Sequence, residues 1–248
     1  MTPDALHEPV IPLTRRHHQR LREVYRSSGW PCLDMIEVEL LACRLLERVC
    51  GQGGHETLRV TDAGMVELAK AFARNKAARS AHEALVERVA REMGRAGRLV
   101  WRALSLRAQV PVAEGGPEDP LAWVVACPDV FSIRNTTVEA YLEPIVHEIK
   151  VSRADLLGDL KKPAKRAAYL GMGGECWYVL GQTAKGQPIA QADEVPPECG
   201  VMHCEGDRLV VARPAPRRAV ERLPFHVWMT LAKAAPATRW EDQEQNTF

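Results

Sequence analysis

The sequence predicts an α/β protein in which a mainly helical region precedes an α/β domain. Helical spacing of apolar side chains dominates the first part of the chain, and short apolar, β-prone runs alternate with helical patterns in the second part. The change of pattern predicts a helical domain over residues 1–78, an α/β domain over 79–215 and a C-terminal helix with a tail over 216–248.

The elements of the first part are bounded by capping residues and glycines. Asp34 is a predicted N-cap, Gly-rich residues 51–54 break the chain, and Thr61 or Asp62 caps the next helix. In chain order we expect helices over 14–26 and 34–49, a short strand over 55–60, and helical residues from 65 to 94, with a new helix starting at Ser80.

The second part alternates strands with helices. Pro163 either kinks the helix after residue 152 or starts a second one, and Gly206-Asp207 marks a hairpin turn. Trp101, Trp123 and Trp177 lie in apolar strands and are expected in the core. In chain order we expect strands over 99–107, 121–133, 143–151 and 175–180, a loop over 111–120, a helix over 152–169, a hairpin within 195–213 and a helix over 225–235.

Two acids and a lysine fall at strand positions where they can meet. Asp129 follows an apolar run, and Glu148 and Lys150 end the next one. Because alternate side chains of a strand share a face, Glu148 and Lys150 are expected to point the same way, and His147 the opposite way into packed surroundings. Two carboxylates can hold a hard divalent cation, and a nearby lysine can orient a water or offset charge on a phosphate.

Pro128-Asp129 followed by Glu148-Ile149-Lys150 resembles the active-site signature of the PD-(D/E)xK nuclease superfamily. The likeness extends over residues 80–215 to a bacterial branch of MmcB-like DNA-repair proteins, through the runs 148–160, 165–169 and 176–179. The resemblance implies a restriction-endonuclease-like mixed-sheet core and metal-dependent hydrolysis of DNA in repair.

In such a site, Asp129 and Glu148 bind Mg²⁺ or Mn²⁺, the carbonyl oxygen of Ile149 adds a third ligand, and Lys150 stands beside the attacking water. Similar nucleases often supply another acid from the preceding helix, here Glu83 or Glu87, and we favour Glu83. The alternative is that Asp129 begins a turn and that Glu148 and Lys150 form an ordinary solvent-facing pair.

Cationic side chains follow this site and suit phosphate. Ser152 is a predicted N-cap, and a helix N-terminus beside positive charge is an anion-binding arrangement. We therefore assign Ser152, Arg153 and Lys165 to nucleic-acid binding. Asp155 and Asp159 match the family pattern, although they can equally serve the helix.

The helix, Gly-rich break, strand and Thr61-Asp-Ala-Gly64 of the first part resemble the wing region of bacterial winged-helix proteins. This resemblance makes the predicted 34–49 helix a candidate for DNA contact. That helix is also apolar and acidic enough to be a core or partner-binding helix, and both readings remain open.

Charge is unevenly distributed although the net charge is only +1. Residues 70–107 hold ten Lys or Arg against three Glu, and residues 15–26 hold five Arg against one Glu. Such asymmetry suits contacts with a phosphate backbone, and it also suits solvated helix faces.

The remaining composition describes a globular, intracellular protein. Seven cysteines without a C-x-x-C pair argue against a disulfide framework and favour a reducing cytoplasm. Cys199, His203 and Cys204 lack a fourth ligand, so zinc is not expected. No apolar run reaches the roughly 20 residues that a membrane helix needs, and the N-terminus has no signal-peptide pattern.

These observations together predict a cytoplasmic, magnesium-dependent deoxyribonuclease that acts on DNA in repair. Three rivals are a nuclease-fold protein that binds DNA without cutting it, a winged-helix transcription regulator, and an interaction module within a repair complex. Homodimerisation and contacts with DNA-repair proteins are compatible with the sequence, and no membrane association is expected.

Overall fold

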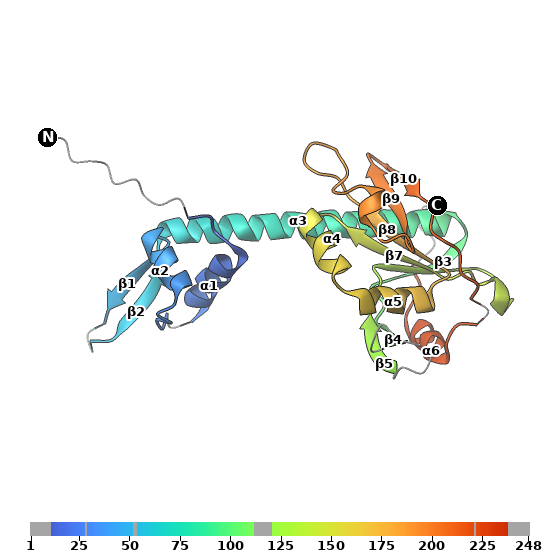
Figure 1. The fold of residues 1–248 in the computed structure, drawn as a ribbon, viewed down its shortest axis with the longest axis horizontal. Coiled ribbons are helices and arrows are strands. Elements are labelled where there is room, and N and C mark those ends of the chain that lie inside the picture. The colour runs from blue at the N-terminus through green and yellow to red at the C-terminus, as the bar shows by residue number, and fades with distance from the viewer. Residues whose placement is uncertain (1–10, 28, 52–53, 112–120, 221, 238–248) are drawn as a thin grey trace, which may run out of the picture. The chain divides into compact units, whose positions relative to one another are not determined.

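The chain divides into two compact units, residues 1–77 and 78–248 (Figure 1). Helix α3 (Asp62–Arg95) has residues in both. The new helix expected at Ser80 is therefore wrong, because alanines on both sides of that position sustain one helix through it. The computed structural model describes residues 11–27, 29–51, 54–111, 121–220 and 222–237, so most of the predicted loop over 111–120 lies outside the described residues.

The first unit contains α1 (Arg15–Arg26), α2 (Met35–Ala42), an antiparallel hairpin of β1 (Leu46–Cys50) and β2 (Glu56–Val60), and the first turns of α3. Its core is a small apolar cluster from all of the shorter elements. The buried members are Leu21, Val24, Leu40, Leu45, Leu46 and Leu58.

The helix expected over 34–49 is half as long as predicted. Asp34 caps it as expected, accepting a hydrogen bond from the Glu37 backbone N–H at 2.9 Å. The helix ends at Ala42, Arg44 has a positive φ of 55°, and the following residues pair with β2. The apolar spacing through Val49 was thus that of a helix joined to a strand, and strand pairing overrides the helical pattern.

Gly29 has a structural role in the first unit. Its φ is +72°, and a Cβ there would lie 2.1 Å from the carbonyl oxygen of Leu58. The Leu58 N–H also donates to the Gly29 carbonyl at 2.6 Å. Only glycine permits this close approach of two backbones.

The second unit is built on a six-stranded mixed sheet of order β10-β9-β8-β7-β6-β3. Neighbours β7–β8 and β8–β9 are parallel, and the other pairs are antiparallel. The expected α/β class with a mixed sheet is confirmed. The strands are β3 (Arg98–Arg102), β6 (Val130–Arg134), β7 (Ile145–Lys150), β8 (Glu175–Leu180), β9 (Gly200–Glu205) and β10 (Arg208–Arg213).

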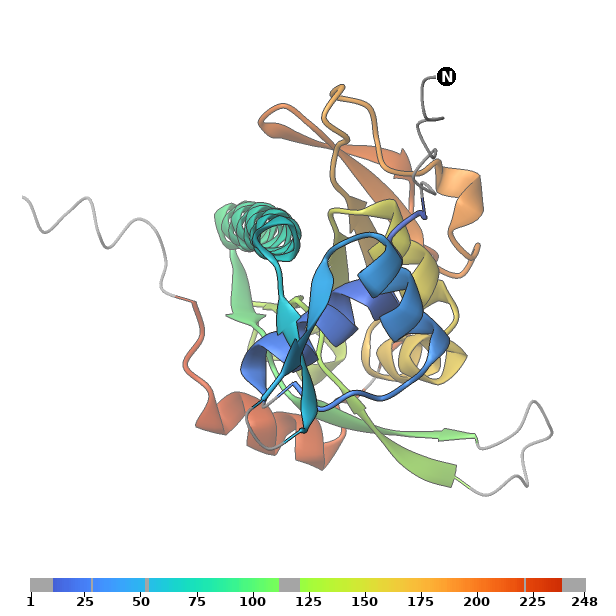
Figure 2. The same cartoon turned by 90° about the vertical axis from the view of Figure 1, so that its left-hand side faces the viewer.

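Both faces of this sheet are covered. The later turns of α3 pack on one face through Leu85, Val86 and Val89. The other face carries α4 (Arg153–Leu160), α5 (Pro163–Met172), α6 (Phe225–Lys233) and the hairpin of β4 (Leu106–Pro111) and β5 (Leu121–Ala126), as Figures 1 and 2 show. The middle strands are therefore buried on both sides, which is why β7 and β8 are almost wholly inaccessible.

The start of α5 and the packing of α6 answer two questions that the sequence left open. Pro163 starts a second helix, since it is the first residue of α5. The C-terminal helix is not separate from the α/β domain, because Val227 and Leu231 lie in the same core cluster as the sheet.

Trp123 is a wrong core prediction. Trp101 and Trp177 are buried, but Trp123 is 56% exposed. The β4–β5 hairpin turns only one face to the core, through residues such as Ala108 and Val110, and Trp123 points to the other face.

No described helix is both long enough and apolar enough to cross a membrane.

Candidate active site

The site lies where β6 and β7 stop pairing with each other. The two strands pair only as far as Val130 and His147, so the last residues of β7 have no partner on that side. Asp129, immediately before β6, fills the place, because its Oδ2 accepts from the Ile149 N–H at 2.7 Å. A strand residue directs its N–H and C=O to the same side, so the Ile149 carbonyl also faces the Asp129 side.

Glu148 and Lys150 share a face of β7, as the alternation of strand side chains predicts. Lys150 Nζ donates to Glu148 Oε1 at 2.7 Å, and the two residues are 3% and 5% exposed. They are therefore not an ordinary solvent-facing pair. Both charges are buried because β7 is a central strand with helices over this face.

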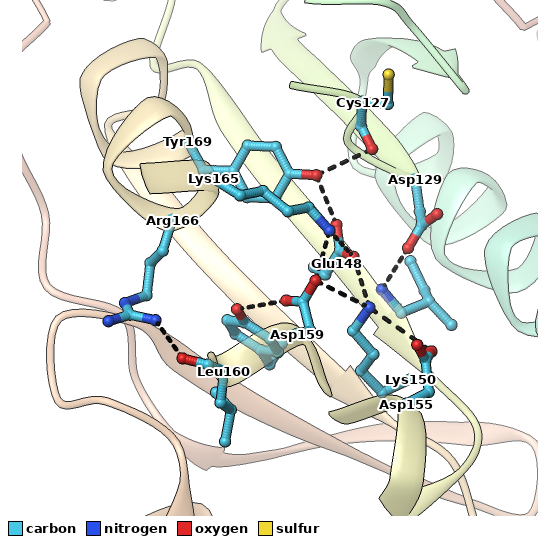
Figure 3. A network of polar contacts seen from close by, with 12 residues as sticks. Cys127, Asp129, Glu148, Lys150, Asp155, Asp159, Leu160, Lys165, Arg166 and Tyr169 are labelled. Carbon is cyan, nitrogen blue, oxygen red and sulfur yellow. Dashed lines mark hydrogen bonds and ion pairs between the residues drawn. The ribbon is translucent and has the colours of Figure 1, made fainter. Parts of the chain in front are cut away.

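The two helices after β7 add a second lysine and a third acid. Lys165 on α5 places Nζ 2.6 Å from Glu148 Oε1 and 2.7 Å from Asp159 Oδ1 (Figure 3). Asp159 on α4 also lies 3.5 Å from Lys150 Nζ, and Asp155, one turn earlier, lies 3.6 Å from it. Glu148 is thus held between two ammonium groups, both of which also contact a helix carboxylate.

Two tyrosines complete the network. The Tyr169 hydroxyl lies 2.8 Å from Glu148 Oε2 and 2.9 Å from the Cys127 carbonyl oxygen, so its single hydrogen serves two acceptors. The Tyr178 hydroxyl donates to Asp159 Oδ2 at 2.9 Å. Burial and the neighbouring carboxylates raise the pKa of both phenols, which keeps them protonated as donors.

The electrostatics of the cluster follow from burial and pairing. Burial and the adjacent negative charge of Glu148 raise the pKa of Asp129. Burial opposes the charged form of Lys150 and of Lys165, but the carboxylates around them outweigh it and raise both pKa values. For Asp159, burial is outweighed by Lys165 and Lys150, and its pKa is lowered. The lysines and Asp159 are therefore charged at neutral pH.

The acid expected from the preceding helix is not in the site. The Glu83 side chain is 68% exposed, and its neighbour His82 reaches Asp129 instead, with Nε2 3.3 Å from Oδ1. Glu87, the other candidate, forms an ion pair with Arg102. Asp129 therefore has an imidazole at the position where a further carboxylate was predicted.

The predicted phosphate-binding residues have separate environments. Ser152 caps α4, its hydroxyl accepting from the Asp155 N–H at 3.2 Å, and is available to an anion only as part of that helix terminus. Arg153 is engaged by Glu194 through two hydrogen bonds of 2.6 and 3.1 Å. Lys165 lies inside the carboxylate network rather than on the surface beside it.

His147 faces away from this network, as predicted. It is 1% exposed, and neither ring nitrogen has a hydrogen-bond partner among the described residues. Burial, aided by the nearby Arg98 charge, lowers its pKa to about 3. His147 is therefore a neutral core side chain.

The donor set suits a hard divalent cation. Four carboxylates surround two ammonium groups, so negative charge is in excess. Each carboxylate oxygen has two lone pairs, and Glu148 Oε2 and Asp129 Oδ2 each accept one described hydrogen bond. Together with the Ile149 carbonyl, these oxygens are the kind of ligand Mg²⁺ and Mn²⁺ prefer.

These candidate ligands are two carboxylates and one backbone carbonyl oxygen, so they include only two side chains. Among the residues that the structure describes, no group of three or more His, Cys, Asp or Glu is arranged to hold a metal ion. That finding leaves open the arrangement of two carboxylates with one backbone carbonyl.

Residues that sequence reasoning did not assign to the site are His82, Tyr169 and Tyr178, and Asp159 was assigned only to the family pattern. Asp155 and Asp159 are four residues apart on one helix, which places them on the same face. That spacing is a usable signal once the helix is known to follow the Glu-x-Lys strand. His82 has no local signal, because its partner Asp129 is distant in the sequence.

No family model and no curated protein matches the sequence. Among solved structures, the chain is similar to a protein of unknown function from Silicibacter pomeroyi, with 21% sequence identity and a TM-score of 0.38. The likeness covers 60% of this chain and 80% of that chain. At this distance the comparison adds nothing to the site, whose chemistry rests on its own residues.

Proposed function

We propose that the second unit is a PD-(D/E)xK-type nuclease domain that hydrolyses DNA phosphodiester bonds with Mg²⁺ or Mn²⁺. The observation that carries this proposal is the convergence of Asp129, Glu148 and Lys150 where β6 and β7 separate. This is the arrangement that the resemblance of the sequence to that superfamily implies. The mixed six-stranded sheet with helices on both faces is compatible with it.

The residues divide the work by position. Asp129, Glu148 and the carbonyl oxygen of Ile149 would hold the cation, which when bound would supply Lewis-acid activation of the phosphodiester. Lys150 Nζ, fixed by Glu148 and Asp159, would place positive charge beside the attacking water and the phosphate oxygen. Tyr169 holds Glu148 from the opposite side and limits its rotation.

The decisive experiment measures cleavage of labelled duplex, single-stranded and branched DNAs with Mg²⁺, Mn²⁺ or EDTA. Lys150→Met keeps the aliphatic stem but removes the ammonium group, and the exposed Lys185→Ala is the matched control. We expect metal-dependent cutting that falls by about a hundredfold or more in Lys150→Met, the usual effect of losing one electrostatic or acid–base group. Equal cutting by both variants would place the activity elsewhere.

One observation favours a second candidate, a nuclease-fold protein that binds DNA without cutting it. Glu148 Oε1 is already held by both Lys150 and Lys165, so metal binding must compete with two internal ion pairs. DNA binding that is indifferent to metal and to Asp129→Asn, with no cleavage of any substrate, would select this candidate.

A further inference from the structure

A groove in the first unit lies between α1 and the first turns of α3. Its volume is about 690 Å³, and all of its lining residues lie between residues 15 and 75, within the first unit. The α1 wall carries Arg15, Arg22 and Arg26, which recur at helical spacing along one face. The α3 wall adds Arg74 and the apolar side chains of Met65 and Phe72.

The groove is strongly positive. Within the described part of the chain, no ion pair joins Arg15, Arg22, Arg26 or Arg74 to a carboxylate, and no acid is among the lining residues. Glu67, next to the lining residue Leu68, forms an ion pair with Lys70 at 2.8 Å, and its charge also interacts with Arg74 and His18 of the groove. Four guanidinium groups over a concave surface favour a partner with regularly spaced negative charges.

Two aromatic rings line the groove from opposite walls. Tyr25 of α1 is 60% exposed and Phe72 of α3 is 72% exposed. Large side chains left so exposed on both sides of a groove indicate a surface that a partner covers. Aromatic rings interleaved with arginines are the combination that binds bases by stacking and phosphates by charge.

The shape of the surface selects the type of nucleic acid. Duplex DNA is read by an element that projects into its roughly 12 Å wide major groove. The α1–α3 surface is a groove with one wall from each helix, and a single strand can lie within it with its bases splayed. We propose that this groove binds single-stranded DNA, with the four arginines on phosphates and Tyr25 and Phe72 stacked on bases.

This inference rests on the proposed function only in taking DNA as the partner, and it names the form of DNA that the protein holds. The groove would retain a single-stranded segment of the substrate independently of hydrolysis. Binding is therefore measured in EDTA, where the nuclease activity plays no part. Cleavage with Mg²⁺ is measured separately from binding in EDTA, so a failure of catalysis and a failure of the groove give different results.

The test uses the full-length chain and a 5′-fluorescein oligo-dT of 20 nucleotides, followed by fluorescence anisotropy. Phe72→Ala should weaken binding about tenfold, as expected for the loss of one base-stacking ring. Its matched control is Val66→Ala, an exposed α3 residue outside the lining, which should change binding less than twofold.

Arg22→Gln supplies a second readout that a loss of folding would not imitate. Removing one phosphate contact from a single-stranded complex should reduce the slope of log K against log salt by about 0.7. Arg16→Gln, an exposed α1 arginine outside the groove, should leave the slope unchanged.

Three outcomes would overturn the proposal. The first is equal loss of binding in Phe72→Ala and Val66→Ala. The second is a 20-base-pair duplex that binds as tightly as oligo-dT and with the same sensitivity to Phe72→Ala. The third is indifference to oligo-dT combined with groove-dependent binding of an acidic amphipathic helical peptide, which would assign the surface to a protein partner.

Discussion

Both units concentrate charged side chains, but they treat those charges in opposite ways. In the second unit, Glu148, Lys150 and Asp159 are each 5% exposed or less and are paired with one another or with Lys165. In the groove of the first unit, the arginines are exposed and form no ion pair with a described carboxylate.

The difference follows from what burial costs. A charge taken out of water must be matched by a partner and by hydrogen bonds, so the cluster around Glu148 has little freedom to move. Exposed arginines keep their hydration and their mobility, and they release counterions when a polyanion binds. The first arrangement is suited to positioning reacting groups, and the second to holding a flexible chain.

The largest expected effect tests whether the buried pairs are as indispensable as this comparison requires. Glu148→Gln leaves Lys150 and Lys165 without their shared negative partner in a buried site. We expect the free energy of unfolding to fall by about 3 kcal/mol, the range observed when one member of a buried pair is removed. Urea denaturation followed by tryptophan fluorescence measures it.

The matched control is Glu47→Gln in the first unit. Glu47 pairs with Arg59 at 2.6 Å, close to the 2.7 Å between Lys150 and Glu148, but both side chains are exposed. Its loss should cost less than about 1 kcal/mol. Similar costs for the two substitutions would mean that burial does not distinguish the two sets of charges.

Metal addition and removal give the next largest effect. If Asp129 and Glu148 hold a cation, 10 mM Mn²⁺ at a Kd of about 1 mM stabilises the folded chain by about 1.4 kcal/mol. Asp129→Asn should abolish this gain, and EDTA should reverse it in the wild type. Thermal unfolding of the second unit provides a readout that does not require DNA cleavage, and an unchanged response in Asp129→Asn would remove Asp129 from the ligand set.

His147 sharpens the comparison, because it is buried without a charged partner of its own. Its pKa is about 3 in the folded chain and roughly 6.5 when unfolded, so between these values only the unfolded state binds the proton. Stability is therefore lost as the pH falls through 6.5 toward 3. His147→Leu should lose about 1.4 kcal/mol less stability than the wild type between pH 7.5 and 5.5.

The same urea titrations at both pH values measure this difference. Comparing two proteins removes the contributions of the acids near β7, which titrate in both. Identical pH dependence would show that His147 is already accessible to protons in the folded state.

The sequence predicts local features of this chain better than features that join distant segments. Asp34 caps α2, Ser152 caps α4, and Glu148 and Lys150 share a face, because each depends on residues a few positions apart. The helix expected to run through Val49 failed, since the pairing of β1 with β2 is decided by a partner strand rather than by the spacing of its own apolar residues.

The same limit applies to the site. Asp129 and the Glu-x-Lys strand were predicted because their order and flanking runs form a pattern. The contacts of His82 with Asp129 and of Tyr178 with Asp159 join elements whose meeting is decided by sheet order and helix placement. We predicted Glu83 as the site residue of the preceding helix, whereas the side chain that reaches the site is that of its neighbour His82.

The smallest expected effect concerns Arg153, an exposed arginine that, unlike those of the groove, is neutralised. Glu194 already holds its guanidinium, so Arg153→Gln should change DNA affinity less than about twofold, since an exposed pair contributes little. Glu194→Gln frees the guanidinium for phosphate and should raise affinity about threefold at 0.1 M salt, with a steeper salt dependence. Anisotropy with a labelled duplex in EDTA measures both variants. If Arg153→Gln weakened binding strongly, the ion pair with Glu194 would have to open on DNA, and pairing in the free protein would no longer separate structural arginines from DNA-binding ones.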